Sequence, residues 1–164
     1  MSLNGMIARK NNEEDFLSHD NWLNWLDALK ETPSIIWGRK THEIVKNWPK
    51  SYFDDIKNTF SVIVSSDKTY KLEDQFVLAD SPKRALEILE KKGFEEVLLT
   101  GGSKLNTSFA KEGLIDEVVL SIEPVIVGEG IPLFDPSLFD LKLEPINITQ
   151  AKGNTMLAQY KVVK

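Results

Sequence analysis

The sequence predicts an α/β sandwich, and two observations carry this prediction. Short apolar runs of strand length alternate with segments whose apolar residues recur every three or four positions. Two strand-like runs in the tail are joined by Gly153-Asn154, which is typical of a β-hairpin. Strands that alternate with helices form a parallel sheet covered by helices, and such a sheet binds ligands at the carboxyl ends of its strands.

The first helix is expected over about residues 20–30, after a mostly polar segment, 4–15, that we expect to form a loop. Ser18 or Asp20 is placed to cap it, and Pro33 ends it. Its apolar face consists of four residues at helical spacing: Trp22, Trp25, Leu26 and Leu29.

The next elements are apolar runs of four or five residues and the polar segments between them. In order, we expect a strand over 34–37 closed by Gly38, a helix from Arg39 to near Pro49, and strands over 60–64 and 76–79.

In the second half, Ser81-Pro82 opens a helix, with serine at the cap and proline at the first helical position. The strand 97–99 then enters Gly101-Gly102, and a helix with Ser103 as its N-cap follows to about residue 112. The remaining expected elements are a strand over 117–127, in which Pro124 indicates an edge or a bulge, and hairpin strands over 141–149 and 156–163.

Composition bounds the class of protein. A chain of 164 residues is expected to form one domain, 1–164, and the absence of cysteine excludes disulfides and cysteine metal sites. His19 and His42 lie on different elements, so we expect no metal site. The net charge of −5 with scattered basic residues argues against nucleic acid as a partner. No apolar run reaches membrane-spanning length and the start does not resemble a signal peptide, so we expect a cytoplasmic protein without a membrane partner.

Three polar or glycine-rich turns follow predicted strands, at 38–41, 65–67 and 100–103. If they lie on one sheet edge, they bring together cations, hydroxyl groups and backbone N–H groups, which is the chemistry that a polyphosphate requires. The alternatives are a tight strand-to-helix turn without a ligand, and a solvated first helical turn at Arg39 and Lys40. Cations at a helix N-terminus oppose the helix dipole, and a bound anion would remove that cost.

The chain resembles the dihydrofolate reductase-like superfamily, and most closely its riboflavin-biosynthesis reductase branch, over nearly its whole length. The segments that carry the resemblance are Ser2–Ala8, Trp37–Glu43, Leu99–Gly102, Gly113–Glu117 and Pro124–Phe134. The resemblance implies a three-layer sandwich with a mixed, mostly parallel sheet and a C-terminal β-hairpin. The family's first strand, which precedes the Ser2–Ala8 segment, has no counterpart in the sequence, so we expect it to be missing.

The resemblance implies NADPH as the hydride donor and assigns its contacts by position. Ile7 and Ala8 would lie beside the nicotinamide. The other implied contacts are Gly38, Arg39, Lys40 and Thr41 at the phosphates, Ser65 and Ser66 at the 2′-phosphate, and Gly101, Gly102, Ser103 and Leu105 at the pyrophosphate.

The substrate side is less well marked. The resemblance places Ser121 where folate enzymes carry a strand threonine, and the first helix should hold a catalytic carboxylate, for which Asp20 and Asp27 are the candidates. Both fall away from the apolar helix face, which favours a solvated role, whereas Asn21 lies nearer the edge of that face. The candidate substrate contacts are Asn4, Trp22 and Glu123. The alternative is core packing for Trp22 and solvent exposure for Glu123.

These observations predict an NADPH-dependent reductase that transfers a hydride to a C=N or C=O bond of a small pyrimidine- or pterin-like heterocycle. The alternative is a catalytically silent domain of the same fold that serves ligand binding or dimerisation, because no acid/base pair stands out. The riboflavin branch also implies a homodimer, with 118–127 and the terminal hairpin as candidate interface.

Overall fold

The computed structural model describes residues 1–164. Its helices are α1 (His19–Glu31), α2 (Arg39–Val45), α3 (Lys50–Ile56), α4 (Pro82–Lys91) and α5 (Ser103–Lys111). Its strands are β1 (Met6–Ala8), β2 (Ser34–Gly38), β3 (Phe60–Val64), β4 (Phe76–Ala79), β5 (Leu98–Leu99), β6 (Glu117–Ile122), β7 (Ile131–Pro132), β8 (Lys142–Gln150) and β9 (Met156–Val163). No helix combines the length and the apolarity that a membrane crossing requires.

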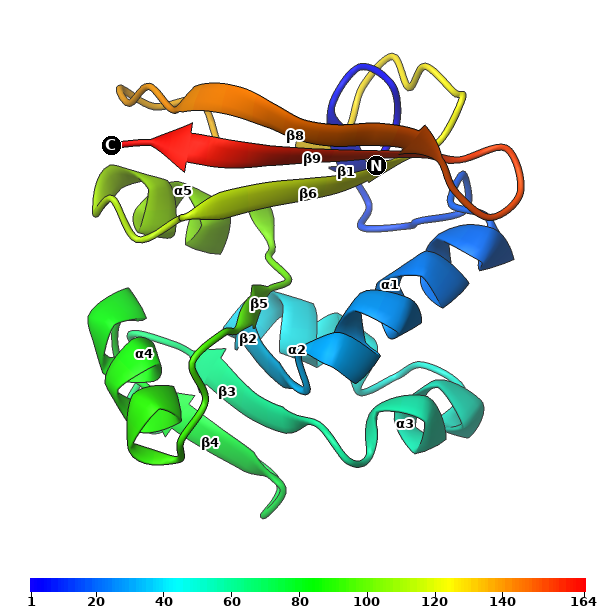
Figure 1. Cartoon of the computed structure of the whole chain (residues 1–164). Helices are drawn as coiled ribbons and strands as arrows, with labels where there is room; N and C mark the ends of the chain where they lie inside the picture. The colour runs from blue at the N-terminus through cyan, green and yellow to red at the C-terminus, as the bar shows by residue number, and fades with distance from the viewer.

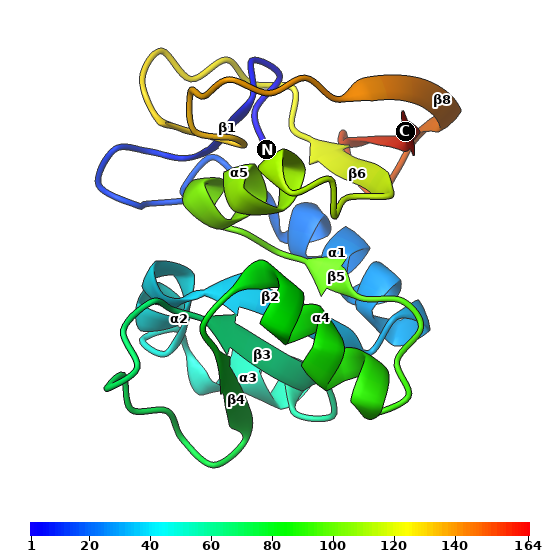
Figure 2. The same ribbon diagram turned by 90° about the vertical axis from the view of Figure 1, so that its left-hand side faces the viewer.

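The strands form three sheets (Figure 1). A parallel four-stranded sheet has the order β4-β3-β2-β5, and an antiparallel three-stranded sheet has the order β6-β9-β8. The short strands β1 and β7 pair antiparallel with each other. In both views α1 and α5 lie between the parallel and the antiparallel sheet (Figures 1 and 2).

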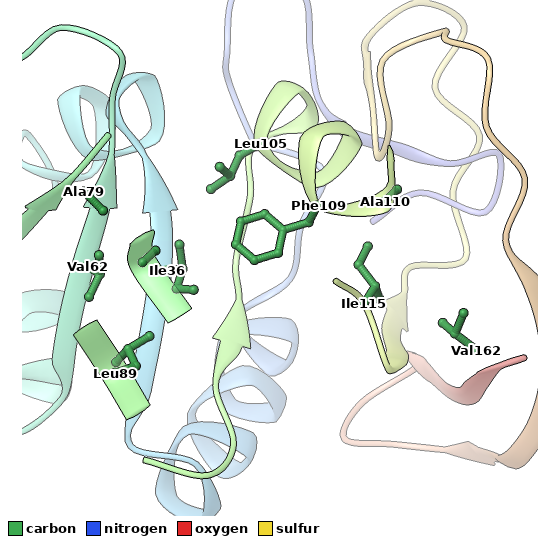
Figure 3. Packing of buried hydrophobic residues seen from close by; sticks show 10 residues of the cluster. Ile36, Val62, Ala79, Leu89, Leu105, Phe109, Ala110, Ile115 and Val162 are labelled. Carbon is green, nitrogen blue, oxygen red and sulfur yellow. The ribbon is translucent and has the colours of Figure 1, made fainter. Parts of the chain in front are cut away.

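The parallel sheet is covered on both faces because its buried strands send alternate side chains to opposite sides. Ile36 and Val62 pack with α4 and α5 on one face, in the cluster drawn in Figure 3. Ile35 and Ile63 pack with α1, α2 and α3 on the other face. The α/β sandwich with a terminal hairpin is therefore confirmed.

Helix α5 links the two larger sheets through the same apolar cluster. Phe109 is 2% exposed and belongs to a cluster that contains Ile36 of β2 and Val162 of β9 (Figure 3). Burying a side chain of that size is worth roughly 1.5–3 kcal/mol, so α5 contributes substantially to holding the sheets together.

Four local predictions are corrected. The strand expected over 117–127 ends at Ile122, because Pro124 has no N–H and because Ile122 already faces Met156, the first residue of β9. The loop expected over 4–15 contains β1, whose pairing with β7 was not visible in a three-residue run.

The helix expected to continue from Arg39 to Pro49 ends at Val45, and Pro49 then caps the separate helix α3. Ser103 is not an N-cap: Gly102 takes that position, and Ser103 Oγ instead donates a 2.7 Å hydrogen bond to Asp135.

The expectation about the family's first strand stays a prediction. Strands β5 and β6 are each the edge of their sheet.

Candidate functional site

The three predicted turns lie at one edge of the parallel sheet. Strand β2 pairs in parallel with both β3 and β5, so the carboxyl ends of these strands meet. The Gly38 N–H donates a 2.8 Å hydrogen bond to the Gly101 carbonyl, which joins the turn after β2 to the turn after β5. The geometric condition for a shared phosphate site is therefore met.

The Gly101-Gly102 turn disfavours side chains. Gly101 has φ +90°, a backbone conformation that favours glycine, and a Cβ on Gly102 would lie 3.2 Å from Thr41 Oγ1. The side chain of Asn106 lies next to Gly101, and its buried Oδ1 has no hydrogen-bond donor. This turn therefore has the two properties of a ligand cradle, close backbone approach and an unpaired polar atom.

The third turn is joined to the others by Arg39. Its Nη1 lies 3.3 Å from Asp67 Oδ2, and its Nε lies 3.7 Å from Glu43 Oε1. The guanidinium also lies over the Tyr70 ring, 5.9 Å from its centroid. Ser65 is buried, and its Oγ accepts a hydrogen bond from the Asp67 N–H, whereas Ser66 and Lys40 are exposed.

The candidate nicotinamide residues Ile7 and Ala8 lie in β1, which is tied to α5 through the segment after β7. The Leu133 N–H donates to the Gly5 carbonyl, and Asn106 Nδ2 donates to the Leu133 carbonyl at 2.9 Å. The side chains of Ser103 and Leu105 are already used by the fold, Ser103 on Asp135 and Leu105 in the apolar cluster.

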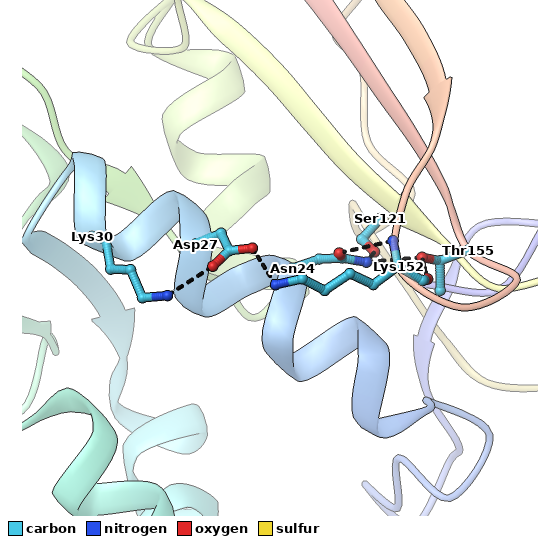
Figure 4. A network of polar contacts seen from close by, with 6 residues as sticks. All are labelled: Asn24, Asp27, Lys30, Ser121, Lys152 and Thr155. Atoms are coloured by element: carbon cyan, nitrogen blue, oxygen red, sulfur yellow. Dashed lines mark hydrogen bonds and ion pairs between the residues drawn. The ribbon is translucent and has the colours of Figure 1, made fainter.

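The candidate catalytic residue Ser121 lies on β6 and faces α1, where Asn24 lies opposite it (Figure 4). Asn21 Nδ2 donates to the Ser121 carbonyl at 3.4 Å, and Asn24 Nδ2 lies 3.5 Å from Ser121 Oγ. Asn24 Nδ2 also donates to Thr155 Oγ1 at 2.8 Å, directly before β9. We call Asn21, Asn24, Ser121 and Thr155 the amide–hydroxyl cluster.

The two aspartates of α1 lie outside this cluster. Asp27 is ion-paired with Lys152 and, at 2.8 Å, with Lys30 (Figure 4), and these hydrogen bonds lower the pKa of its carboxyl to about 2. Its carboxylate is thereby held in the charged form by two lysines. Asp20 lies against Gly153 in the β8–β9 turn and makes no hydrogen bond to Ser121. The assignment of Asp20 as catalytic stays a prediction.

The three candidate substrate residues all make structural contacts. Glu123 is 6% exposed, and its Oε1 accepts hydrogen bonds from the Ser18 N–H at 2.9 Å, from Ser18 Oγ at 2.7 Å and from Asn21 Nδ2 at 3.2 Å. Asn4 holds the backbone of Val127 with both ends of its amide. Their role toward a substrate stays a prediction.

Trp22 lies in an aromatic cluster that joins α1 to the α2–α3 region. Its ring centroid is 4.9 Å from that of Trp25 and 4.7 Å from that of Tyr52, and its Nε1 donates to Asp55 at 3.2 Å. These contacts agree with the packing alternative stated for this residue.

Asn24 is the polar residue of α1 that sequence reasoning missed. Asn21 and Asn24 are three positions apart, so both project from one side of the helix. Their spacing was visible, but the identity of the strand opposite them was not, because Ser121 lies about a hundred positions further along the chain.

Comparison with known proteins assigns the family. A model of the RibD C-terminal domain matches residues 1–157. The chain belongs to this family. The Bacillus subtilis protein YyaP is 31% identical over 156 residues, which cover 90% of this chain and 83% of YyaP. The resemblance to the riboflavin-biosynthesis branch is thereby confirmed.

Two further relatives refine the picture of the RibD C-terminal domain family. The 2,5-diamino-6-ribosylamino-4(3H)-pyrimidinone 5′-phosphate reductase of Methanothermobacter thermautotrophicus is 51% identical over 83 residues, 47% of this chain and 38% of that protein. A putative riboflavin biosynthesis protein from Shewanella sp. PV-4 has a similar structure, with a TM-score of 0.79 and 25% identity, and the match covers 100% of this chain and 96% of that one. The fold is accordingly that of the RibD reductase domains.

Proposed function

We propose that the protein is an NADPH-dependent reductase that acts on a small pyrimidine-like heterocycle. The observation that carries this proposal is the convergence of three phosphate-suited turns at one sheet edge. The Gly38 N–H bonds the Gly101 carbonyl there, and Arg39 Nη1 lies 3.3 Å from Asp67 Oδ2. Family membership and the matched pyrimidinone phosphate reductase support the same class of reaction.

The residues at this edge suit a dinucleotide. The backbone of Gly101-Gly102 would approach the pyrophosphate, and Arg39 would pair with a phosphate through its planar set of N–H donors. Ser65 and Ser66 would contact the adenosine end, and Ile7 and Ala8 the nicotinamide end. Bound NADPH would supply the hydride, while the protein orients the substrate and excludes water.

The substrate would lie at the amide–hydroxyl cluster, beside Ser121. Amide and hydroxyl groups offer both donors and acceptors, which match the amino and carbonyl groups of a pyrimidine. Most of these groups are already paired with each other, but the Ser121 hydroxyl only accepts a hydrogen bond, from Asn24 at 3.5 Å, so its own proton is available.

A second candidate is a catalytically silent domain that binds a nucleotide without turnover. The observation that favours it is the identity of residue 21, where an asparagine rather than an acid faces Ser121. Turnover distinguishes the two functions.

The first experiment is a titration of the protein with NADPH and with NADH, followed by tryptophan fluorescence and by calorimetry. Trp37 is 3% exposed and directly precedes Gly38, so it is a suitable reporter. Arg39→Ala is expected to weaken NADPH binding about tenfold, because a charge-assisted hydrogen bond is worth roughly 1.5–3 kcal/mol. Arg84→Ala removes an exposed arginine on α4 and should leave binding unchanged.

If neither nucleotide binds at millimolar concentration, the proposed function is wrong. If NADPH binds, its loss of absorbance with the pyrimidinone phosphate of the related reductase tests turnover. Binding without oxidation of NADPH by any pyrimidine or pterin would favour the silent domain.

A further inference from the structure

An aspartate stands at the adenosine end of the candidate site and faces the arginine expected to bind phosphate. Asp67 follows Ser65-Ser66 in the turn after β3, and its Oδ2 lies 3.3 Å from Arg39 Nη1. Arg39 belongs to α2 and Asp67 to the turn after β3, so the pair joins two of the three turns.

Asp67 is held in place by its own turn. Its Oδ1 accepts hydrogen bonds from the Thr69 N–H at 2.9 Å and from Thr69 Oγ1 at 2.7 Å, and its N–H donates to Ser65 Oγ. The hydrogen bonds from Thr69, together with the Arg39 guanidinium, lower the pKa of the Asp67 carboxyl. The carboxylate is therefore charged at neutral pH and cannot turn away from Arg39 without losing these bonds.

The two carboxylates around Arg39 disfavour the binding of a further anion there. Its guanidinium is shared between Asp67 and Glu43, so one positive charge faces two negative ones. A phosphate monoester brings up to two more negative charges at neutral pH. A ribose hydroxyl, in contrast, can donate a hydrogen bond to a carboxylate, which is how acidic residues select NAD in other dinucleotide sites.

We propose that Asp67 is a specificity-determining residue that reduces the preference of this site for a 2′-phosphate over a 2′-hydroxyl. The inference rests on the proposed function, because it concerns the adenosine end of the same dinucleotide site. It predicts a protein that uses NADPH with a smaller advantage over NADH than Arg39 and the two serines alone would give.

The test replaces the charge and keeps the shape. Asp67→Asn retains Oδ1 as acceptor for Thr69, and it is expected to lower the dissociation constants of NADPH and of adenosine 2′,5′-bisphosphate about tenfold. The dissociation constants of NADH and of ADP should stay within about twofold or rise. The smaller Asp67→Ser variant should shift the ratio in the same direction, and thermal melts establish that both variants are folded.

Asp80→Asn is the matched control. Asp80 follows the neighbouring strand β4 and lies 4.0 Å from Lys68, so the variant loses the same charge nearby without touching Arg39. It should change the binding of all four ligands by similar small factors. Comparing the two variants separates the general effect of losing one negative charge near the site from the specific effect of losing the carboxylate that faces Arg39.

Two results would overturn the inference while leaving the proposed function intact. One is NADPH binding by the wild type with an unchanged NADPH-to-NADH ratio in Asp67→Asn. The other is weaker NADPH binding in Asp67→Asn, which would mean that the aspartate positions Arg39 for the phosphate. If the wild type binds none of the four ligands, the proposed function fails as well.

Discussion

The buried carboxylate of Glu123 is expected to be a principal support of α1, and its removal tests that role. The side chain accepts three hydrogen bonds, two of them from Ser18, which is also the N-cap of α1. Hydrogen bonds to charged groups are worth roughly 1.5–3 kcal/mol each, but bonds that share one acceptor atom are not additive. Glu123→Ala is therefore expected to lower the free energy of unfolding by about 3 kcal/mol.

For a chain of this length that loss corresponds to a drop of about 6–12 °C in melting temperature. Urea denaturation followed by circular dichroism measures the loss in free energy of unfolding. Glu123→Gln keeps an acceptor oxygen and should lose only about 1 kcal/mol. Glu117→Ala, at the exposed start of the preceding strand β6, should stay within about 0.5 kcal/mol. A loss below about 1 kcal/mol in Glu123→Ala would refute the reasoning.

Three further predictions concern pH, assembly and turnover. His42 is 1% exposed, and burial lowers its pKa below the usual 6.5, against the opposing effect of Glu73, so the unfolded chain takes up the proton first. The free energy of unfolding should fall as the pH drops below about 6.5, and pH-dependent melts of His42→Phe should lack this component. We propose that the exposed strand β8, where Ile148 is 52% exposed, contributes to a homodimer. Ile148→Lys should then shift the sedimentation coefficient toward that of the monomer. A wild-type protein that is monomeric at micromolar concentration would contradict this proposal. Ser121→Ala should lower kcat/KM about threefold to tenfold without changing the dissociation constant of NADPH. If NADPH binding weakened by the same factor, Ser121 would instead contact the cofactor.

The convergence of the three turns was predictable because its signals are local. Each turn directly follows a strand, and parallel pairing brings strand ends together whatever the exact register. Sequence alone therefore predicted that the turns holding Gly38, Arg39 and Gly101 meet at one edge. It did not identify the Arg39–Asp67 pair, because the charge state and direction of one side chain in a turn depend on neighbours from another element.

The contacts at the amide–hydroxyl cluster and at β1 were not predictable for a related reason. Asn21 meets Ser121 across one hundred positions, and β1 meets β7 across a similar span, so neither contact leaves a local pattern. Apolar residues also continue beyond Ile122 to Val127, and the start of the partner β9 at Met156 shows where pairing stops.

The two sides of the candidate site depend on different supports, and this has a physical consequence. The phosphate turns belong to the parallel sheet, whose core is complete on both faces. The amide–hydroxyl cluster exists only where α1 meets the antiparallel sheet, and Glu123 and Asn24 hold that junction. Loosening the junction displaces Ser121 relative to α1 but leaves the contact between Gly38 and Gly101 in place. Variants at Glu123 should therefore weaken substrate affinity before they weaken nucleotide affinity.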